Sequence, residues 1–394
     1  MSNKFLPVLT PLRGLAALFV VLFHARLILF PQINPEIKIY SAFLENAYLW
    51  VDLFFILSGY VMLHCYQQTF SSGITRQSWK RFIWLRFTRI YPLFLITLLC
   101  LIAWESYKQQ HGIGFFGGAL LNSWGLAGIP AFAGPFNTSQ TLLSNLLMLQ
   151  GLSSYGLSWN IAGWSLSIEW LCYLAFPFSV PFLLRLRSKL PLLLLVNAGI
   201  LISLVSLYGT LDLTTGVGAL LRGWIGFTTG ASLCCYVSLS ARSALANPWL
   251  PLLTFIACLL VMHFSQNVWS LLACYPLFAV LVASSATQKH PQHIANRLLD
   301  NRLTNWLGEL SYSMYLWHCV LLLAGVEILN LINPLAVDKW YQQTSWLAHL
   351  LAISGFLGLL IALSALSYYG FEKPIMKWLR RQPAAQMQAE TKRT

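Results

Sequence analysis

Charged residues are scarce in this sequence. Asp, Glu, Lys and Arg make up 9% of the 394 residues, whereas hydrophobic residues make up 57%. Soluble domains carry about 25% charged residues, and the mean hydropathy of this chain is +0.63. The composition therefore excludes a soluble enzyme with a membrane anchor and predicts a polytopic membrane protein.

Acidic residues are the scarcest charged group, with 12 Asp and Glu against 25 Lys and Arg. In a soluble protein this balance would suggest nucleic acid, but in a membrane protein basic residues gather in cytoplasmic loops. We therefore expect a lipid bilayer and no nucleic acid as a partner. With the N-terminus in the cytoplasm, all but five Lys and Arg fall on the cytoplasmic side; the five are Arg26, Lys38, Lys108, Arg222 and Lys339.

Several sequence motifs are also absent. The eight cysteines lie in apolar segments without CxxC spacing, which predicts neither a metal site nor a disulfide framework. The sequence contains no GxSxG, Walker A, HExxH or GxGxxG motif. Soluble hydrolase, ATPase, metalloprotease and dinucleotide-binding functions therefore have no support.

Long apolar segments are abundant, and ten of them approach the roughly 20 residues that a bilayer requires. They lie near 10–30, 47–65, 90–104, 161–184, 190–208, 216–239, 249–264, 267–285, 306–328 and 346–369. We predict an all-α bundle of about ten transmembrane helices, with both termini in the cytoplasm. The first helix is expected to be retained. We predict one transmembrane domain over residues 1–378 and a short, disordered polar tail over 379–394.

The first apolar segment, Leu9 to Phe30, carries two ionisable residues, Arg13 and His24. Eleven residues of helix place both side chains on one face, roughly 16 Å apart along the axis. Ionisable groups at membrane depth are costly, which makes them candidates for function. The alternative is a snorkelling arginine and a histidine that forms a structural hydrogen bond within the bundle.

The segment from Arg76 to Pro92 alternates basic and aromatic residues. This pattern is typical of an amphipathic helix at the membrane interface. Within it, Arg86 and Arg89 are three residues apart and share one helical face. Two guanidinium groups in this arrangement also suit a polyphosphate, which is the functional alternative.

The external stretch from Glu105 to Asn160 has only Glu105 and Lys108 as charged residues. A loop of this length is usually functional or disordered. Leu142 to Leu149 is expected to form a short helix that lies on or dips into the membrane. The aromatic residues of the stretch are suited either to stacking on sugars or to anchoring at the interface.

Four further polar residues fall within apolar segments, namely Asp52, Glu169, Arg222 and His318. A buried carboxylate without a partner is expensive, so Glu169 is a candidate for function. For His318 a structural hydrogen bond is the alternative. All four are candidates to line one polar cavity, although the sequence does not show that they meet.

Taken together, the chain resembles acyltransferase family 3, the membrane-bound O-acyltransferases of bacterial surface glycans. The resemblance rests on the order and spacing of several motifs along nearly the whole chain. These are Arg13-x10-His24, VDLFFILSGYVM at 51–62, RxxRIxP as Arg86, Arg89, Ile90 and Pro92, WSLSIEWLCYLAFP at 164–177, LGELSYSMYLWH at 307–318 and YGFEKPI at 369–375.

The resemblance implies a location in the bacterial plasma (inner) membrane and a cytosolic acyl-CoA donor, usually acetyl-CoA, as co-substrate without a permanently bound cofactor. It implies as acceptor a hydroxyl group of a lipid-linked or exported glycan. It also implies ten core helices with the N-terminus inside. The acceptor's identity, the acyl length and the oligomeric state are left open.

The residues suggest a mechanism for such a transfer. We expect His24 to act as general base, with Glu169 or another acid orienting it. Arg13 would stabilise charge at the cytoplasmic end of the cavity, and Arg86 and Arg89 would bind CoA phosphates. An acyl-His24 relay is an alternative. A proton-coupled exporter and a non-catalytic scaffold are the alternatives from other functional classes.

Overall fold

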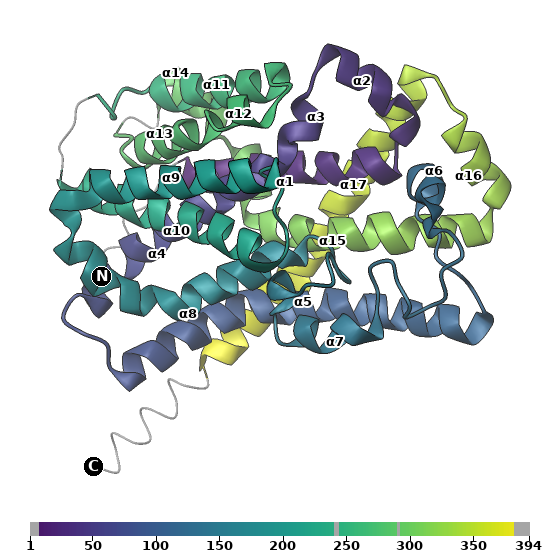
Figure 1. The fold of residues 1–394 in the computed structure, drawn as a ribbon, viewed down its shortest axis with the longest axis horizontal. Helices are drawn as coiled ribbons and strands as arrows, with labels where there is room; N and C mark the ends of the chain where they lie inside the picture. The colour runs from purple at the N-terminus through teal and green to yellow at the C-terminus, as the bar shows by residue number, and fades with distance from the viewer. Residues whose placement is uncertain (1–7, 240–243, 290–291, 382–394) are drawn as a thin grey trace, which may run out of the picture.

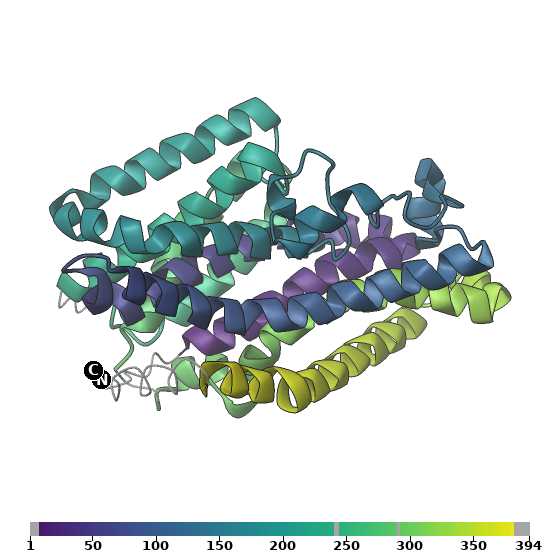
Figure 2. The same ribbon diagram turned by 90° about the horizontal axis from the view of Figure 1, so that it is seen from below.

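The protein is an all-α membrane bundle, as predicted. The structure is a computed structural model that describes residues 8–239, 244–289 and 292–381, and within these residues no strand is formed. Its long helices run side by side along the long axis of the molecule (Figures 1 and 2).

Two groups of helices build the bundle. The long helices are α1 (Leu9–Ile28), α4 (Trp50–Phe70), α5 (Arg76–His111), α8 (Gly163–Arg185), α9 (Leu190–Tyr208), α10 (Gly216–Leu239), α11 (Leu250–Phe264), α13 (Cys274–Ala286), α15 (Arg302–Ile332) and α17 (Trp346–Ser367). The short helices are α2 (Asn34–Tyr40), α3 (Phe43–Asn46), α6 (Gly118–Leu121), α7 (Ser139–Leu146), α12 (Val268–Leu271), α14 (Ile294–Leu299) and α16 (Pro334–Tyr341).

All ten predicted apolar segments are helical. Within the described part of the chain, eight helical segments are long and apolar enough to cross a membrane by length and composition. The other two predicted segments correspond to α10 and to α11, which has 15 residues. Helix α10 is rich in glycine and hydroxyl residues, a composition that is compatible with its packing against α4, α8, α9 and α13.

Helices α1 and α15 run parallel and approach closely through two glycines. A Cβ on Gly14 would lie 2.6 Å from the backbone nitrogen of Gly308, and a Cβ on Gly308 would lie 2.2 Å from the carbonyl oxygen of Thr10. Small residues allow helix backbones to approach in this way. Ten residues further along each helix, the same alignment brings His24 beside His318.

Helices α4 and α10 form a second close contact through glycines. A Cβ on Gly59 would lie 1.9 Å from the carbonyl oxygen of Phe227, and a Cβ on Gly230 would lie 1.9 Å from that of Ile56. Any side chain at these positions would separate the helices. The contact fixes one face of α4 toward α10 and leaves another face toward the interior of the bundle.

Helix α5 is longer than the sequence analysis predicted. We expected an interfacial helix that ended near Pro92 and a separate span over 90–104, but one helix runs from Arg76 to His111. It begins at a capping box formed by Thr75 and Ser78. It continues through Pro92, and the Tyr312 hydroxyl donates to the carbonyl of Ile90 beside the proline. Membrane helices tolerate proline where neighbouring groups satisfy the backbone.

The stretch after α5, which we predicted to be external, returns deep into the bundle. Asn137 donates to Glu105 on α5 at 2.8 Å, whereas the Tyr91 hydroxyl donates to the carbonyl of Leu146 at 2.9 Å. Glu105 and Tyr91 are 14 residues apart, which is about 21 Å of helix. The predicted short helix is therefore present and dips inward, but it spans Ser139–Leu146 and ends before Met148, whose φ is 54°.

A buried ionic cluster attaches this stretch to α5 and α15. Lys108 lies 2.7 Å from Glu105 and 3.0 Å from Glu327, and all three side chains are almost fully buried. The two carboxylates also accept hydrogen bonds from the backbone N–H groups of Phe132 and Phe116. The only two charged residues of the predicted external stretch thus serve as its anchor.

The C-terminal helix extends past the predicted end of the transmembrane domain. The chain stays helical through Arg381, so residues 379–381 belong to the helix and not to the tail. The indole of Trp84 on α5 donates to the carbonyl of Leu379 at 3.1 Å. The rest of the predicted tail lies outside the described residues.

Candidate active site

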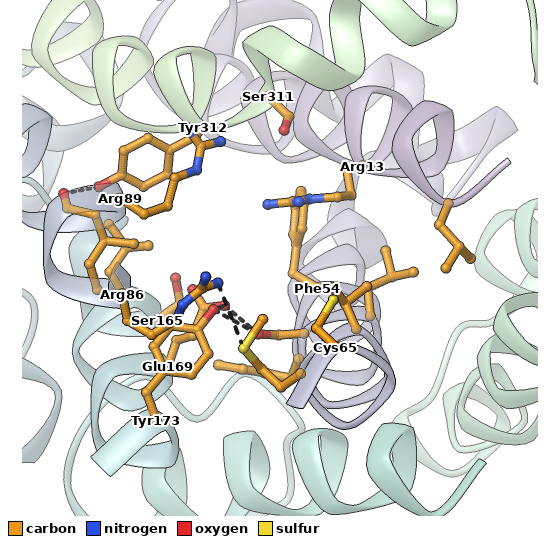
Figure 3. Close-up of a pocket in the computed structure, with 18 of the residues that line it drawn as sticks. Arg13, Phe54, Cys65, Arg86, Arg89, Ser165, Glu169, Tyr173, Ser311 and Tyr312 are labelled. Carbon is orange, nitrogen blue, oxygen red and sulfur yellow. Dashed lines mark hydrogen bonds between the residues drawn. The ribbon is translucent and has the colours of Figure 1, made fainter. Parts of the chain in front are cut away.

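A cavity of about 830 Å³ lies between α1, α4, α5, α8 and α15. A volume of this size suits a small-molecule ligand. Three of the predicted arginines line it, Arg13 from α1 and Arg86 and Arg89 from α5, together with Glu169 from α8. Figure 3 shows the guanidinium groups of Arg13 and Arg86 pointing into the open space from opposite sides.

The arginines differ in how they are held. Arg86 donates to the hydroxyl of Tyr66 at 3.0 Å, and its Nε is buried without a hydrogen-bond partner. Arg89 lies 3.7 Å from Glu372 and over the ring of Tyr312. Within the described residues, no carboxylate lies within 4 Å of Arg13 or Arg86. The cavity therefore has an excess of positive charge that favours an anionic ligand.

Glu169 has partners within the cavity. It accepts hydrogen bonds from Ser58 at 2.6 Å and from Tyr173 at 2.5 Å. The hydrogen bonds of His24 go instead to the carbonyl of Val20 and to His318. The structure therefore does not pair Glu169 with His24, and the predicted acid–histidine contact is wrong. The carboxylate lies on α8 across the cavity, where the nearest hydroxyl groups take its hydrogen bonds.

The lining residues of α4 show which groups follow one another from the open end of the cavity to its inner end. They lie on one face from Gln68 to Val51, a separation of about 26 Å along the helix. Gln68 and Cys65 are exposed and mark the open end. The side chain of Met62 contacts Arg86, and Ser58 contacts Glu169, one turn further in. Phe54 and Val51 follow at the inner end.

Two aromatic rings meet at the inner end of the cavity. Phe54 and Tyr315 pack edge to face with their centroids 6.0 Å apart. The Tyr315 hydroxyl lies 2.7 Å from that of Ser165 and donates to the carbonyl of Ala162 at 3.1 Å. The Tyr315 ring also packs against His318, with the two ring centroids 5.8 Å apart.

His24 and His318 form a pair just beyond these rings. His318 Nε2 lies 3.2 Å from His24 Nδ1, and the two ring centroids are 5.0 Å apart. His318 is fully buried, whereas His24 is partly exposed. Neither histidine is among the described residues that line the cavity. The histidine pair therefore lies outside the cavity, and the Tyr315 ring lies between His318 and the rest of the cavity lining.

The backbone around the pair favours one tautomer of each ring. His318 Nδ1 lies 3.1 Å from the carbonyl of Met314, and His24 Nδ1 lies 3.0 Å from that of Val20. A carbonyl accepts only from N–H, so both protons are assigned to Nδ1. His24 Nε2 then keeps a free lone pair, and His318 Nε2 accepts from His24. This is the state that a general base requires.

Asp52 and Arg222, two more of the predicted polar residues, pair with each other. Arg222 lies 2.8 Å from Asp52, and both side chains are fully buried. Tyr275 donates a further hydrogen bond to Asp52 at 2.7 Å. Neither residue lines the cavity. Asp52, Arg222 and His318 therefore lie outside the cavity, and His318 instead contacts His24, another predicted site residue.

The sequence analysis did not identify Phe54, Tyr315 and Glu372 as site residues. Phe54 and Tyr315 lie within the family-like motifs at 51–62 and 307–318, but nothing in their residue type separates them from core aromatics. Glu372 stands in the motif at 369–375 and pairs with Arg89 across the bundle. A carboxylate within an apolar segment was the signal that could have identified it.

The helices and the cavity define a multi-pass membrane protein with a cationic cavity that is open at one end. Residues 9–373 match the model of a family described as an acyltransferase domain. The match covers nearly all of the chain, so the protein belongs to this acyltransferase family. No solved structure matches the chain.

Two of the curated relatives that the chain matches are named as O-acetyltransferases. The chain is 23% identical to the peptidoglycan O-acetyltransferase OatA of Listeria monocytogenes over 95% of this chain and 56% of the relative. It is 23% identical to the putative peptidoglycan O-acetyltransferase YrhL of Bacillus subtilis over 95% of this chain and 55% of the relative. It is also 34% identical to protein 2 in the picA locus of Rhizobium radiobacter, over 24% of this chain and 42% of the relative. The chain thus spans about half the length of the curated relatives that it matches.

Proposed function

We propose that this protein is an integral membrane O-acyltransferase that moves an acyl group from cytosolic acyl-CoA to a hydroxyl group of a cell-surface or lipid-linked glycan. The observation that carries the proposal is the cavity with Arg13, Arg86 and Arg89, whose inner end lies next to the histidine pair. The match to an acyltransferase family and the printed names of the relatives support the reaction class.

The donor's phosphates bind at the open end of the cavity in this proposal. Arg86 and Arg89 supply guanidinium groups there, and planar forks of this kind suit phosphate oxygens. The narrower inner part, along α4 from Ser58 to Phe54, takes the pantetheine arm and the thioester. Glu169, with Ser58 and Tyr173, supplies polar groups along this path.

Transfer takes place at His24. Its Nε2 accepts the proton of the acceptor hydroxyl, whose oxygen attacks the thioester carbon. The carbon–sulfur bond breaks, the CoA thiolate leaves, and the proton moves from the imidazole to the thiolate. The Val20 carbonyl and His318 orient the base through Nδ1. Arg13 stabilises negative charge of the bound CoA at the cytoplasmic end of the cavity.

The test is CoA release by purified protein in nanodiscs, supplied with acetyl-CoA and a cell-envelope glycan extract. We expect His24→Ala to lower the rate by about 10²–10⁴-fold, the usual contribution of a general base. His111→Ala is the matched control, because His111 is exposed at the end of α5 far from the cavity.

Two outcomes contradict parts of the proposal. Full acetyl transfer by His24→Ala would exclude this histidine as the base. Failure of the wild-type protein to bind any acyl-CoA would exclude the donor and would favour the exporter hypothesis instead.

A further inference from the structure

The Phe54–Tyr315 pair lies at the end of the cavity that is nearest to the histidine pair. Its cavity side belongs to the lining of the donor cavity. On the far side, the Tyr315 ring lies against His318, which is in contact with His24. A thioester that enters with its CoA in the cavity must therefore pass these rings before His24 can act on the acceptor beside it.

Tyr315 is fixed more firmly than a ring packed by apolar contacts alone. Only 6% of it is exposed, and its hydroxyl has partners in both Ser165 and the carbonyl of Ala162. Ser165 also donates to Ala162, at 3.2 Å, so the three groups form one closed network. Rotation of the Tyr315 ring would break these hydrogen bonds in a buried site, at a cost for each polar group left unpaired.

Phe54 forms the other side of the passage and has no such anchor. Its ring meets Tyr315 edge to face and is partly exposed to the cavity. Phe54 is thus the side chain whose size sets the width of the passage. Its neighbour Phe55 also contributes to the cavity lining but is only 2% exposed, and its ring lies toward α10, where a Cβ on Gly223 would be 3.1 Å from it.

We infer that Phe54 and Tyr315 form a constriction that selects the acyl group of the donor by its width, so that acetyl passes to His24 and branched acyl groups do not. The inference rests on the proposed function. Selection of this kind acts after the CoA moiety has bound at the arginines, so it appears in turnover and leaves affinity unchanged.

The experiment compares acetyl-CoA with isobutyryl-CoA, measuring both the Kd of each donor and the rate of CoA release. We expect the wild-type protein to bind both donors with similar Kd and to turn over only acetyl-CoA efficiently. Phe54→Ala should raise the ratio of isobutyryl to acetyl turnover by about 10-fold or more, the range that a methyl group confers in a shaped pocket. The Kd values should stay within about twofold.

The matched control is Phe182→Ala, which removes the same ring from α8 at a position 57% exposed on the outside of the bundle. The ratio of isobutyryl to acetyl turnover in this variant should equal that of the wild type. Phe54→Leu, a smaller change, decides the question if Phe54→Ala does not accumulate. Tyr315→Phe keeps the ring and removes its hydrogen bonds, and it should raise the ratio less than Phe54→Ala.

The outcomes separate the inference from the proposed function. If the wild type turns over acetyl-CoA and the ratio is the same in every Phe54 variant, the constriction does not select the acyl group. If the wild type already turns over both donors equally, the inference is equally wrong. If the wild type binds no acyl-CoA, the proposed function fails, and the inference fails with it.

Discussion

At the scale of single residues, the arginines of the cavity differ in how their charge is balanced. Glu372 lies 3.7 Å from Arg89, whereas the partners of Arg86 within the described residues are Tyr66, Met62 and aromatic rings. Its buried Nε lacks a hydrogen-bond partner. Buried polar atoms in native proteins are usually paired, so this unpaired atom sets Arg86 apart from Arg89. Its guanidinium points into the cavity without a carboxylate partner among the described residues, so its charge is available to an anionic ligand (Figure 3).

Replacing Arg86 should therefore weaken donor binding. We expect Arg86→Ala to raise the Kd for acetyl-CoA by about 10–100-fold, the range for a charged hydrogen bond. Isothermal titration in detergent measures it. Arg76→Ala is the control, because this arginine is exposed in the first turn of the same helix. Equal Kd values for the two variants would remove Arg86 from the donor site.

The sequence predicted some of these residues and not others, for physical reasons. Arg13, Arg86 and Arg89 stand out because charge at membrane depth is rare, and the structure brings all three to one cavity. The partner of His24 did not stand out, because it depends on the parallel packing of α1 and α15. Glu169 was given the wrong partner for the same reason. Contacts between side chains on different helices depend on how the helices pack. Residue spacing within one helix carries no information about that packing.

At the scale of helices, two glycine contacts set the positions of the site residues. The contact of Gly14 with Gly308 fixes the height of α1 against α15, and with it the meeting of His24 and His318. Arg13 is the neighbour of Gly14 in sequence. A change in this contact would move both the cavity arginine and His24.

Adding a single methyl group at the contact between α1 and α15 should disturb it measurably. A Cβ on Gly308 would lie 2.2 Å from the carbonyl oxygen of Thr10, so Gly308→Ala must push the helices apart. We expect a loss of about 1–3 kcal/mol in stability, as for other overpacked sites, and a loss of turnover. Thermal unfolding in detergent measures the stability.

The control for this variant is Gly355→Ala on α17, where the added Cβ has no neighbour within 4 Å. Alanine has the higher helix propensity, so this change should be neutral or slightly stabilising. If Gly308→Ala unfolds at the same temperature as Gly355→Ala, the α1–α15 contact is looser than described.

Helix prediction from the sequence was most accurate where apolar runs are long. All ten predicted segments are helical, because a run of about 20 apolar residues has few alternatives in a bilayer. The continuity of α5 was missed, because charges and Pro92 each suggested a boundary that the bundle overrides. The depth of the stretch around α7 depends on contacts with Tyr91 and Glu105, which no local pattern shows.

At the scale of the whole molecule, the cavity opens at one end of the bundle. Exposed Gln68 and Cys65 of α4 lie at this end. The predicted topology, with the N-terminus inside, places it in the cytoplasm, where acyl-CoA is found in the proposed function. The eight cysteines offer a direct test, because Cys65 and Cys100 are exposed and the other six are buried.

Cys65 should report both orientation and occupancy. We expect a membrane-impermeant maleimide to label it in inside-out vesicles and not in right-side-out vesicles. CoA at about ten times its Kd should slow the labelling about tenfold, because the cysteine lines the cavity. Cys65→Ser is the control and should lose the part of the labelling that CoA slows, because exposed Cys100 does not line the cavity. Labelling only in right-side-out vesicles would reverse the topology.

The inward-dipping stretch around α7 also has a consequence for how the protein is made. Backbone at membrane depth must find polar partners within the protein. Gly151 donates its backbone N–H to Ser167 on α8, and Asn160 donates to the carbonyl of Leu316 on α15. Both partners are synthesised after the segment that needs them. The stretch therefore reaches its final depth only after α15 has left the ribosome, so the active cavity is completed late in biogenesis.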